Sequence, residues 1–422
     1  MNEKIAINQP SCGDDVDTSA LPVEEAMQRI EATIKAVQNT ELVPIRNALG
    51  RTLADDVHST MNVPRHTNSA MDGYAIAATD LSDNKSIQLR VVATALAGQA
   101  YQGNIKPGEC VRIMTGAKMP HGTDTVIMQE HVALDGDMIR FNPGHKPGQN
   151  VRQAGEDLSI GQIAISAGKK LTPAELGLLA SMGMAEIKVR RKLRVSFFST
   201  GDELRSINEP LREGEIYDSN RYTLHGMLSR LQVDITDLGV IPDQPQAIRQ
   251  AFLQASSNAD VVITTGGVSV GEADYVKDII TEVGQVDFWK LAIKPGRPLA
   301  FGKINKATFF GLPGNPVAVM VTFYQFVQPT LRRIMGQTDI SPFRFKVPCS
   351  SALKKKSGRV EYYRGILETD NQGQMTVRKA GMQGSGVLST MSKANCFIVL
   401  PSDSNTIEPE QLVEVEPFEG LI

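Results

Sequence analysis

The 422-residue sequence predicts a multidomain protein: a central α/β domain on a parallel sheet, a small mostly-β domain, a helical and extended linking domain, and a C-terminal β module. Three observations predict this class. At about 150 residues per domain, the length allows roughly three domains. Strand-like and helical runs alternate over residues 193–335, which is typical of crossover units around a parallel sheet. Residues 59–158 and 343–422 instead contain short β-prone runs separated by glycine and proline turns.

In the alternating region, each strand-like run is followed by a polar or glycine-rich segment. The strands read LRVSFFS, DITDLGVI, DVVITT and ATFFGL, and the helices read RYTLHGMLSRLQ, QPQAIRQAFLQAS and PVAVMVTFYQFVQPTLRRIM. The segments that follow the strands are STGDEL, IPDQP, TTGGVSVGEADY and GLPGNP. Ligands of parallel sheets bind at the carboxyl ends of the strands, so we expect these four segments to converge on one rim.

Two further helices are predicted outside this region. Residues 23–38 carry one apolar helical stripe, with steps of four and three residues between Val23, Met27, Ile30, Ile34 and Val37. The segment LTPAELGLLASMG carries start signals, namely Thr172 as N-cap, Pro173 at the first helical position and Glu175 at N3. Gly183 predicts where this second helix stops.

Composition argues against several classes of function. The net charge of −3 argues against a protein that binds nucleic acid by neutralising phosphates. The four cysteines form no C-x-x-C, so a reduced, cytoplasmic setting fits best. The scattered histidines argue against a zinc site. The N-terminus lacks a signal segment and the longest apolar run is too short and polar to span a bilayer, so we expect no membrane association.

The segment TTGGVSVGEADY resembles a phosphate-binding loop that lacks its lysine. Gly266 and Gly271 have the P-loop spacing, but Glu272 stands where the lysine belongs. Glycines can turn backbone N–H groups toward an anion, and Ser269 adds a hydroxyl donor. The acidic residues, Glu272 and Asp274, cannot hold phosphate directly, but they can hold Mg²⁺ that bridges carboxylate to phosphate. The alternative is a tight strand-to-helix turn with both carboxylates in the first helical turn.

Cations lie on two turns that contain proline. LAIKPGRPLAFG places Lys294 and Arg297 around a Pro-Gly pair, and proline restricts the backbone there. GLPGNPVAV, with Pro313 and Pro316, predicts a rigid turn into a helix whose N-terminus is a further anion site. Two ordinary turns are the alternative. Carboxylates and cations on one rim predict a site for both a metal ion and an oxyanion.

Further polar candidates lie at the other strand ends. Asp202 and Glu203 in STGDEL could be helix-start charges, or ligands and acid/base groups. EIYDSNRYTL has three capping residue types in a row, Asp218, Ser219 and Asn220, where a single cap would suffice. Capping alone remains the alternative for that segment.

Single candidates occur elsewhere in the chain. Asp243 follows a strand in IPDQP, Asp72 lies in the turn signal of SAMDGYA, Thr115 follows a strand in RIMTGA, and Asp157 lies in AGED. For Asp72 a plain hairpin turn is the alternative. The three lysines of LKKKSGR predict a solvated turn.

These segments together resemble one family. SAMDGYA, IMTGA, AGED, FFSTGDEL, YDSN, TTGGVSVGEADY, KPGRP and GLPGNP are similar to motifs of the molybdopterin molybdenumtransferases of the MoeA type, which in turn resemble the E domain of gephyrin. The motifs occur in family order, from about residue 20 to the C-terminus, without departure at the motif positions. The resemblance implies a molybdopterin-binding-like central domain among four subdomains, and an elongated homodimer with the active site near its interface.

The resemblance and the sequence patterns together divide the chain. We expect residues 1–20 to form a disordered polar tail, outside the resemblance. The predicted subdomains are an elongated linking and dimerisation part at 21–58 and 159–190, a mostly-β part at 59–158, the α/β part at 191–340 and a C-terminal β part at 341–422.

The resemblance also implies an activity and its residues. Such enzymes insert molybdate into the dithiolene of adenylylated molybdopterin with Mg²⁺, releasing AMP and molybdenum cofactor. The implied catalytic residues are Asp72, Thr115, Asp157, Glu203, Asp243 and Asp274, of which Asp243 and Asp274 would hold Mg²⁺. The substrate- and phosphate-binding candidates are Asp218, Ser219, Asn220, Gly266, Gly267, Ser269, Gly271, Pro313 and Pro316. The molybdate-binding candidates are Lys294, Arg297, Arg364 and Ser385, the last two from YYRG and QGSG.

The chemical properties of molybdate and of these side chains are compatible with the implied roles. Molybdate is a tetrahedral dianion, which cationic side chains can hold with charge-assisted hydrogen bonds. Glu203 is the candidate for proton handling, because oxo groups must leave as water. Candidate partners are a second copy of the chain, a molybdopterin adenylyltransferase and proteins that mature molybdoenzymes.

Two other classes of function stay open at this point. Gephyrin-like domains also bind receptor peptides, so an inactive scaffold could keep the fold, although it would not need the acidic set. A molybdopterin adenylyltransferase is the other alternative, but such proteins resemble only the α/β part of this chain.

Overall fold

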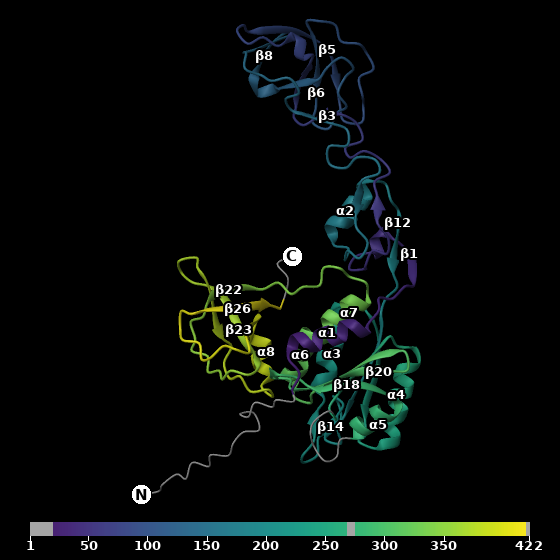
Figure 1. Cartoon of the computed structure of the whole chain (residues 1–422). Coiled ribbons are helices and arrows are strands. Elements are labelled where there is room, and N and C mark those ends of the chain that lie inside the picture. Colours follow the sequence, from purple (N-terminus) through teal and green to yellow (C-terminus); the bar gives the residue numbers. More distant parts are fainter. Residues whose placement is uncertain (1–19, 268–274, 419–422) are drawn as a thin grey trace. The chain divides into compact units, whose positions relative to one another are not determined.

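The computed structural model describes residues 20–267 and 275–418 (Figure 1). The chain divides into two compact units. The first comprises Met1–Glu41, Gly50–Thr52 and Arg190–Ile422, and the second comprises Leu42–Leu49 and Leu53–Val189.

A six-stranded sheet lies at the centre of the first unit, in the order β16-β13-β17-β21-β20-β18 (Figure 1). Its strands are β13 (Arg194–Thr200), β16 (Asp234–Ile241), β17 (Val261–Thr265), β18 (Gly284–Lys290), β20 (Pro298–Ile304) and β21 (Ala307–Leu312). The first four in this order are parallel, and all four were predicted. β20 and β18 extend the sheet antiparallel. The sheet is therefore mixed, because the tight turn at Asn305 (φ 52°) returns the chain as a hairpin.

Helices cover both faces of this sheet. They are α3 (Ser219–Arg230), α4 (Pro245–Asn258), α5 (Tyr275–Val283), α6 (Pro316–Thr322) and α7 (Gln328–Ile334). The long helix predicted after GLPGN is confirmed as α6 and α7, joined by a π-helical turn at Phe323–Val327. That turn precedes Pro329, which has no N–H and whose ring clashes with the carbonyl one turn back in a regular helix.

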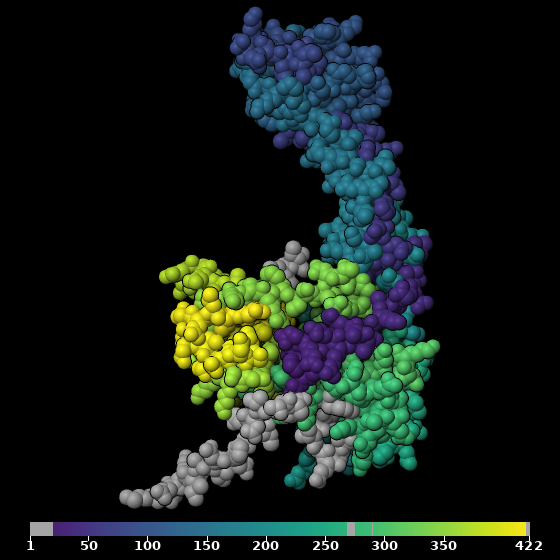
Figure 2. Space-filling view, in the orientation of Figure 1, coloured from purple at the N-terminus to yellow at the C-terminus, as the bar shows by residue number. Residues whose placement is uncertain are grey.

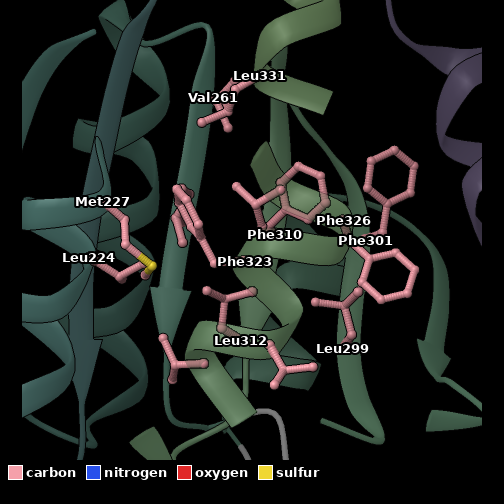
Figure 3. Close-up of a cluster of buried hydrophobic side chains, with 14 of the residues drawn as sticks. Leu224, Met227, Val261, Leu299, Phe301, Phe310, Leu312, Phe323, Phe326 and Leu331 are labelled. Carbon is pink, nitrogen blue, oxygen red and sulfur yellow. The ribbon is translucent and has the colours of Figure 1, made fainter. Parts of the chain in front are cut away.

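The apolar side chains of the sheet alternate between two cores. Phe197 and Phe310 belong to the core on one face, and their neighbours Phe198 and Phe309 belong to the core on the other face. Figure 3 shows part of the first core, in which Phe301, Phe310 and Leu312 of the sheet meet residues of the covering helices. The helix residues labelled there are Leu224, Met227, Phe323, Phe326 and Leu331.

The predicted N-terminal helix also packs into this core. α1 (Val23–Thr33) buries Ala26 and Ile30 there. In the space-filling view, the purple α1 segment lies between the green α/β part and the yellow C-terminal module (Figure 2). The helix ends earlier than predicted, because Ile34 adopts an extended conformation (φ −92°, ψ 152°).

The C-terminal module is a second six-stranded sheet within the first unit, ordered β19-β23-β25-β26-β22 with β24 on β23. Its elements are β19 (Ile293–Lys294), β22 (Phe345–Pro348), β23 (Val360–Thr369), β24 (Met375–Lys379), α8 (Leu388–Lys393), β25 (Cys396–Leu400) and β26 (Leu412–Pro417). β19 comes from the KPGRP turn, so the turn contributes a strand to this sheet. Its Lys294 pairs with Glu361 in parallel register.

The three-lysine run was predicted to be a solvated turn, and this is wrong for Lys355. Lys355 is buried, and its ammonium donates to the carbonyls of Lys356 and Ser404, both at 3.2 Å. Burial lowers the pKa of Lys355, and the nearby Glu361 acts in the opposite direction. The lysine therefore ties two loops of the module together.

The second unit contains the small β part, with strand order β7-β4-β6-β5-β9-β8. These strands are β4 (Gly73–Ile76), β5 (Ile87–Ala95), β6 (Glu109–Ile113), β7 (Thr125–Met128), β8 (Val132–Asp135) and β9 (Met138–Phe141). Beside them, β3 (Asn68–Ser69) pairs with β10 (Val151–Arg152). A Cβ atom on Gly73 would lie 2.0 Å from the carbonyl oxygen of Ile127, so only glycine fits the approach of β4 to β7.

The remaining elements are short. They are β1 (Thr40–Pro44), β2 (Val57–His58), β11 (Ile163–Ile165), α2 (Pro173–Ser181), β12 (Glu186–Arg190), β14 (Leu204–Arg205), β15 (Ile216–Tyr217) and 3₁₀ turns at Ile45–Asn47, Ala78–Asp80 and Gln129–His131. The signals predicted for α2 are confirmed. The carboxylate of Glu175 accepts the N–H of Thr172 at 2.8 Å, and Gly183 adopts φ 73° after the helix. Across the described ranges, no helix has the length and apolar character needed to cross a bilayer.

Phe310→Ala tests the importance of the first core. Phe310 is fully buried on the central strand β21, with its ring 5.2 Å from that of Phe301. We expect the substitution to lower the free energy of unfolding by about 3–5 kcal/mol, because it removes apolar burial and leaves a cavity. Urea denaturation followed by circular dichroism measures the change. Leu253→Ala, at an exposed position on α4, is the control and should change stability far less.

Candidate active site

The four predicted segments begin side by side at one edge of the sheet. Ser199 of β13 pairs with Thr265 of β17, and Thr265 pairs with Leu312 of β21. On the other side, Thr200 of β13 pairs with Ile241 of β16. Because these strands are parallel and end at the same level, STGDEL, IPDQP, TTGG and GLPGNP leave the sheet together.

The two glycines after β17 are required by close packing. Gly266 adopts φ 83°, and a Cβ there would lie 2.4 Å from the carbonyl oxygen of Thr200. Gly267 adopts φ 65°, and a Cβ there would lie 2.4 Å from the side chain of Val276. Only glycine therefore lets this backbone pass against β13 and α5. Four other residues of this segment that the sequence singled out lie outside the described residues: Ser269, Gly271, Glu272 and Asp274.

Three carboxylates gather at the ends of β13 and β16. The N–H of Asp243 donates to a carboxylate oxygen of Asp202 at 3.1 Å. The pKa of Asp243 is raised by burial, and further by the negative charges of Asp202 and Glu203. A nearby cation would act in the opposite direction and lower the pKa of Asp243.

The start of α3 is more than a helix cap. One oxygen of Asp218 accepts the N–H of Arg221 at 3.1 Å, so Asp218 is the N-cap. The amide nitrogen of Asn220 donates to the carbonyl of Gly314 at 2.7 Å, which ties the YDSN segment to the GLPGNP turn. Ser219, between them, is exposed.

Four buried polar atoms at this edge have no hydrogen-bond partner among the described residues. They are the second carboxylate oxygen of Asp218, the amide oxygen of Asn220 and the hydroxyl oxygens of Thr200 and Thr264. Each unpaired buried group costs free energy, commonly about 1–3 kcal/mol. The helix cap gives a hydrogen bond to only one of the two carboxylate oxygens of Asp218. Several such atoms at the edge of one sheet favour a polar ligand that would satisfy them.

The GLPGNP turn brings Pro313 and Pro316 to the start of α6. An anion site was predicted at this helix start, but the first backbone N–H of the helix already has an acceptor within the protein. The N–H of Val317 donates at 3.1 Å to the carbonyl of Ser385, from the QGSG loop of the C-terminal module. The proline turn and the QGSG loop are therefore in direct contact.

The KPGRP turn is anchored on the C-terminal module. The ammonium of Lys294, which is half exposed, lies 3.7 Å from the carboxylate of Glu361, which is buried. Gly296 adopts φ 105°, and a Cβ there would lie 2.6 Å from the side chain of Thr322 on α6. The glycine lets the turn pack against this helix, and Arg297 is partly buried beside it.

Arg364 is buried completely, and Ser385 is partly exposed. The guanidinium of Arg364 donates to Thr390 and to the carbonyls of Met382 and Gly384. Burial lowers the pKa of Arg364 to about 10. Its contacts thus lie within the protein, on the loop that carries Ser385.

Three predicted site residues lie in the second unit. The same carboxylate oxygen of Asp72 accepts the N–H and the hydroxyl of Thr115, both at 2.7 Å, so the structure brings this pair together. The pKa of Asp72 is lowered by the backbone N–H of Thr115 and then by its hydroxyl. Asp157 is exposed in another loop, where its N–H donates to the carbonyl of Val63 at 3.0 Å.

Sequence reasoning missed Glu361, Thr200 and Thr264. A charged residue inside the strand-like run VEYYRGIL was the available signal for Glu361. The two threonines look like ordinary strand residues, and only their buried, unpaired hydroxyls distinguish them.

Comparison with known families matches most of the chain. Residues 21–183 match the MoeA N-terminal region (domain I and II), and residues 346–418 match the MoeA C-terminal region (domain IV). Between them, residues 196–333 match a probable molybdopterin binding domain. This last range contains the sheet edge with its glycines, carboxylates and unpaired polar atoms.

Individual relatives are similar to this chain along nearly its whole length. The molybdopterin molybdenumtransferase of Haemophilus influenzae is 45% identical over 404 residues, which cover 95% of this chain and all of that protein. Gephyrin of Dictyostelium discoideum is 33% identical over 93% of this chain and 61% of its own length. The crystal structure of the molybdopterin biosynthesis moeA protein from Pyrococcus horikoshii OT3 superposes with a TM-score of 0.82, at 29% identity over 94% of this chain and all of that one.

The fold and the matches define a multidomain protein built around a molybdopterin-binding type of α/β domain. The chain belongs to the family of molybdopterin molybdenumtransferases of the MoeA type, and it is an enzyme of that family.

Thr115→Val tests the electrostatics of Asp72. The variant keeps the backbone donor but loses the hydroxyl, so we expect the pKa of Asp72 to rise toward the ordinary value of 3.8 without reaching it. In wild type, Asp72 therefore stays ionised to lower pH than in the variant. Titration of ¹³C-carboxyl-labelled aspartate by NMR gives the midpoint, with Thr94→Val on β5 as the control. An unchanged midpoint in Thr115→Val would contradict the assigned hydrogen bond.

Proposed function

We propose that this enzyme inserts molybdenum from molybdate into adenylylated molybdopterin, in an Mg²⁺-dependent reaction that releases AMP and molybdenum cofactor. Family membership supports the reaction class. The observation that carries the proposal is the group of four buried polar atoms that have no partner in the described part of the chain, beside carboxylates and glycines at the carboxyl ends of the parallel strands. A polar ligand at this edge would satisfy them.

The unpaired atoms favour the pterin over the phosphate at the start of α3. The oxygens of Asp218 and Asn220 that lack a partner among the described residues are hydrogen-bond acceptors, so a ligand that pairs with them would carry donors. A pterin ring carries N–H donors along its edge, whereas an ionised phosphate carries only acceptors. We therefore assign this pair to the pterin, with Ser219 beside it. Backbone N–H groups of the segment that contains Gly266, Gly267, Ser269 and Gly271 then remain for phosphate.

The carboxylates fit a magnesium ion in part. Burial, and then the negative charges of Asp202 and Glu203, raise the pKa of Asp243, and a divalent cation would offset those charges. No group of three or more possible metal-ligating side chains occurs in the described parts of the chain. Mg²⁺ does not need one, because it keeps several waters and commonly takes one or two carboxylates plus substrate phosphate. Asp243 would serve here, with Asp274 as the second candidate.

When bound, Mg²⁺ would neutralise charge on the phosphate linkage. The chain's own residues would then orient the second substrate. Lys294 and Arg297 of the KPGRP turn are proposed to bind molybdate, with charge-assisted hydrogen bonds to its oxygens. Glu361 holds the Lys294 ammonium in place, and Ser385 offers a hydroxyl on the adjoining loop. Glu203 is proposed to supply protons to oxo groups that leave as water.

We further propose that the protein works in the cytoplasm as a homodimer with its active site near the interface, as the resemblance implies. Asp72, Thr115 and Asp157 are proposed to serve that site. The hydrogen bonds of Thr115 fix the orientation of the Asp72 carboxylate. Candidate partners outside the dimer are a molybdopterin adenylyltransferase and molybdoenzyme maturation proteins. Sedimentation of the purified chain measures the oligomeric state, and a monomer under assay conditions would contradict the dimer.

One assay separates this reaction from the alternatives. The purified enzyme is supplied with adenylylated molybdopterin, molybdate and Mg²⁺, and both AMP and active molybdenum cofactor are measured. The proposal expects both products. A scaffold would yield neither, and an adenylyltransferase would instead consume molybdopterin and ATP.

Asp243→Asn tests the role of the carboxylate group at the sheet edge. Loss of this ligand should raise the Mg²⁺ concentration needed for half-maximal AMP release by about tenfold or more. Asp287→Asn, at an exposed position on β18, serves as the matched control and should keep the wild-type Mg²⁺ dependence. Wild-type Mg²⁺ dependence in Asp243→Asn would remove Asp243 from the metal site.

A further inference from the structure

Three polar side chains meet where the long helix of the α/β part packs against the C-terminal module. Gln325 belongs to the π-helical turn between α6 and α7, Arg344 directly precedes β22, and Glu416 lies on β26. Gln325 and Glu416 are buried, and the side chain of Arg344 is 29% exposed. This polar triad lies outside all the segments that carry candidate site residues.

Each member of the polar triad is hydrogen-bonded to the other two. One carboxylate oxygen of Glu416 accepts the amide nitrogen of Gln325, and the other accepts Nε of Arg344, both at 2.8 Å. A terminal nitrogen of Arg344 donates to the amide oxygen of Gln325 at 3.0 Å. Both ends of the Gln325 amide and both oxygens of Glu416 are therefore used. The other terminal nitrogen of Arg344 donates to Glu414 at 3.4 Å.

Aromatic rings from both parts lie next to the polar triad. The ring of Tyr324, from the π-helical turn, is parallel to that of Phe418 at 5.9 Å and edge-on to that of Phe397 at 6.0 Å. Such apolar packing holds two surfaces together, but it is non-directional and does not by itself fix one register between them. Hydrogen bonds are directional, so the polar triad forms only when helix and module are aligned.

The alignment of these two parts bears on both proposed substrates. The molybdate-binding candidate Ser385 lies on the module, and the module residue Glu361 lies 3.7 Å from Lys294. The pterin-binding candidates Asp218 and Asn220 lie on the α/β part instead. A shift of the module would therefore move the candidates for one substrate and leave those for the other in place.

We propose that Gln325, Arg344 and Glu416 are positioning residues, which fix the register of the C-terminal module on the α/β part and so align the molybdate-binding side chains with the sheet edge. The inference rests on the proposed function for the identity of the substrates. Stability alone does not require the polar triad, because replacing buried ionic groups by apolar residues of similar volume is often neutral or stabilising. The polar triad adds a fixed register, which apolar packing does not supply.

The double variant Gln325→Leu with Glu416→Leu tests this role through the two KM values. Arg344 keeps Glu414 and its exposed surface in this variant, so we expect little change in the free energy of unfolding. The KM for molybdate should rise by about tenfold, because a small misplacement of binding groups weakens their contacts. The KM for adenylylated molybdopterin should keep its wild-type value. A wild-type KM for molybdate, or an equal rise in both KM values, would overturn the proposal.

A distance measurement tests the register without any substrate. Spin labels are attached to Leu253→Cys on α4 and Met375→Cys on β24, which are exposed positions. Cys12→Ser is included, and the other three cysteines are buried. Double electron–electron resonance should give a broader or shifted distance distribution in the double variant than in the otherwise wild-type chain. Identical distributions would overturn the proposal.

Arg333→Ala is the matched control for both measurements. This arginine lies on α7, shortly after the π-helical turn, in an exposed ion pair with Glu31, and its loss should change neither the KM values nor the distances. If the double variant fails to fold, Gln325→Leu alone decides the outcome. It keeps the ion pair of Arg344 with Glu416 and should change the same quantities in the same direction.

The two proposals fail separately. If the wild-type enzyme shows no molybdate-dependent release of AMP, the proposed function is wrong. The spin-label distances still measure the register in that case. Unchanged distances in an active enzyme would overturn the role of the polar triad and leave the proposed function intact.

Discussion

The in-register pairing of four parallel strands fixes where every polar segment of the α/β part begins. Because β16, β13, β17 and β21 end at the same level, their following segments share one edge of the sheet. The backbone hydrogen bonds of the strands are made within the sheet, whereas several polar side chains at its edge have no partner among residues 20–267 and 275–418. The unpaired oxygens of Asp218, Asn220, Thr200 and Thr264 lie in these segments or directly before them. Regular pairing stops at this edge while burial continues, which is why we propose the ligand site there.

The C-terminal module depends on this edge for its own arrangement. β19 leaves the KPGRP turn and pairs with β23, which brings Lys294 beside Glu361. A few residues along β23, Arg364 holds the loop whose Ser385 carbonyl occupies the first amide of α6. Strand β23 therefore contacts two segments that carry candidate oxyanion-binding residues. They are the KPGRP turn and the loop that contains Ser385. Their alignment depends on the packing of the module against α6 rather than on either segment alone.

The acidic and the basic candidate residues have different surroundings. Asp243 has a pKa raised by burial and by the charges of Asp202 and Glu203. Lys294, whose side chain is half exposed, has its ammonium 3.7 Å from the buried carboxylate of Glu361.

Local patterns in the sequence determined the fold class, the four parallel strands and the caps of α2, because periodicity, capping residues and glycine turns act within a few neighbouring residues. They also placed Gly266 and Gly267 correctly at a strand end. The antiparallel extension by β20 and β18, the burial of Lys355 and the pairing of Lys294 with Glu361 were decided only by the tertiary structure. The same holds for the burial of Arg364, which the resemblance offered as a molybdate-binding candidate in YYRG. Its partners lie about twenty residues away in the chain, and whether a charge faces solvent or backbone carbonyls depends on which distant segments pack against it.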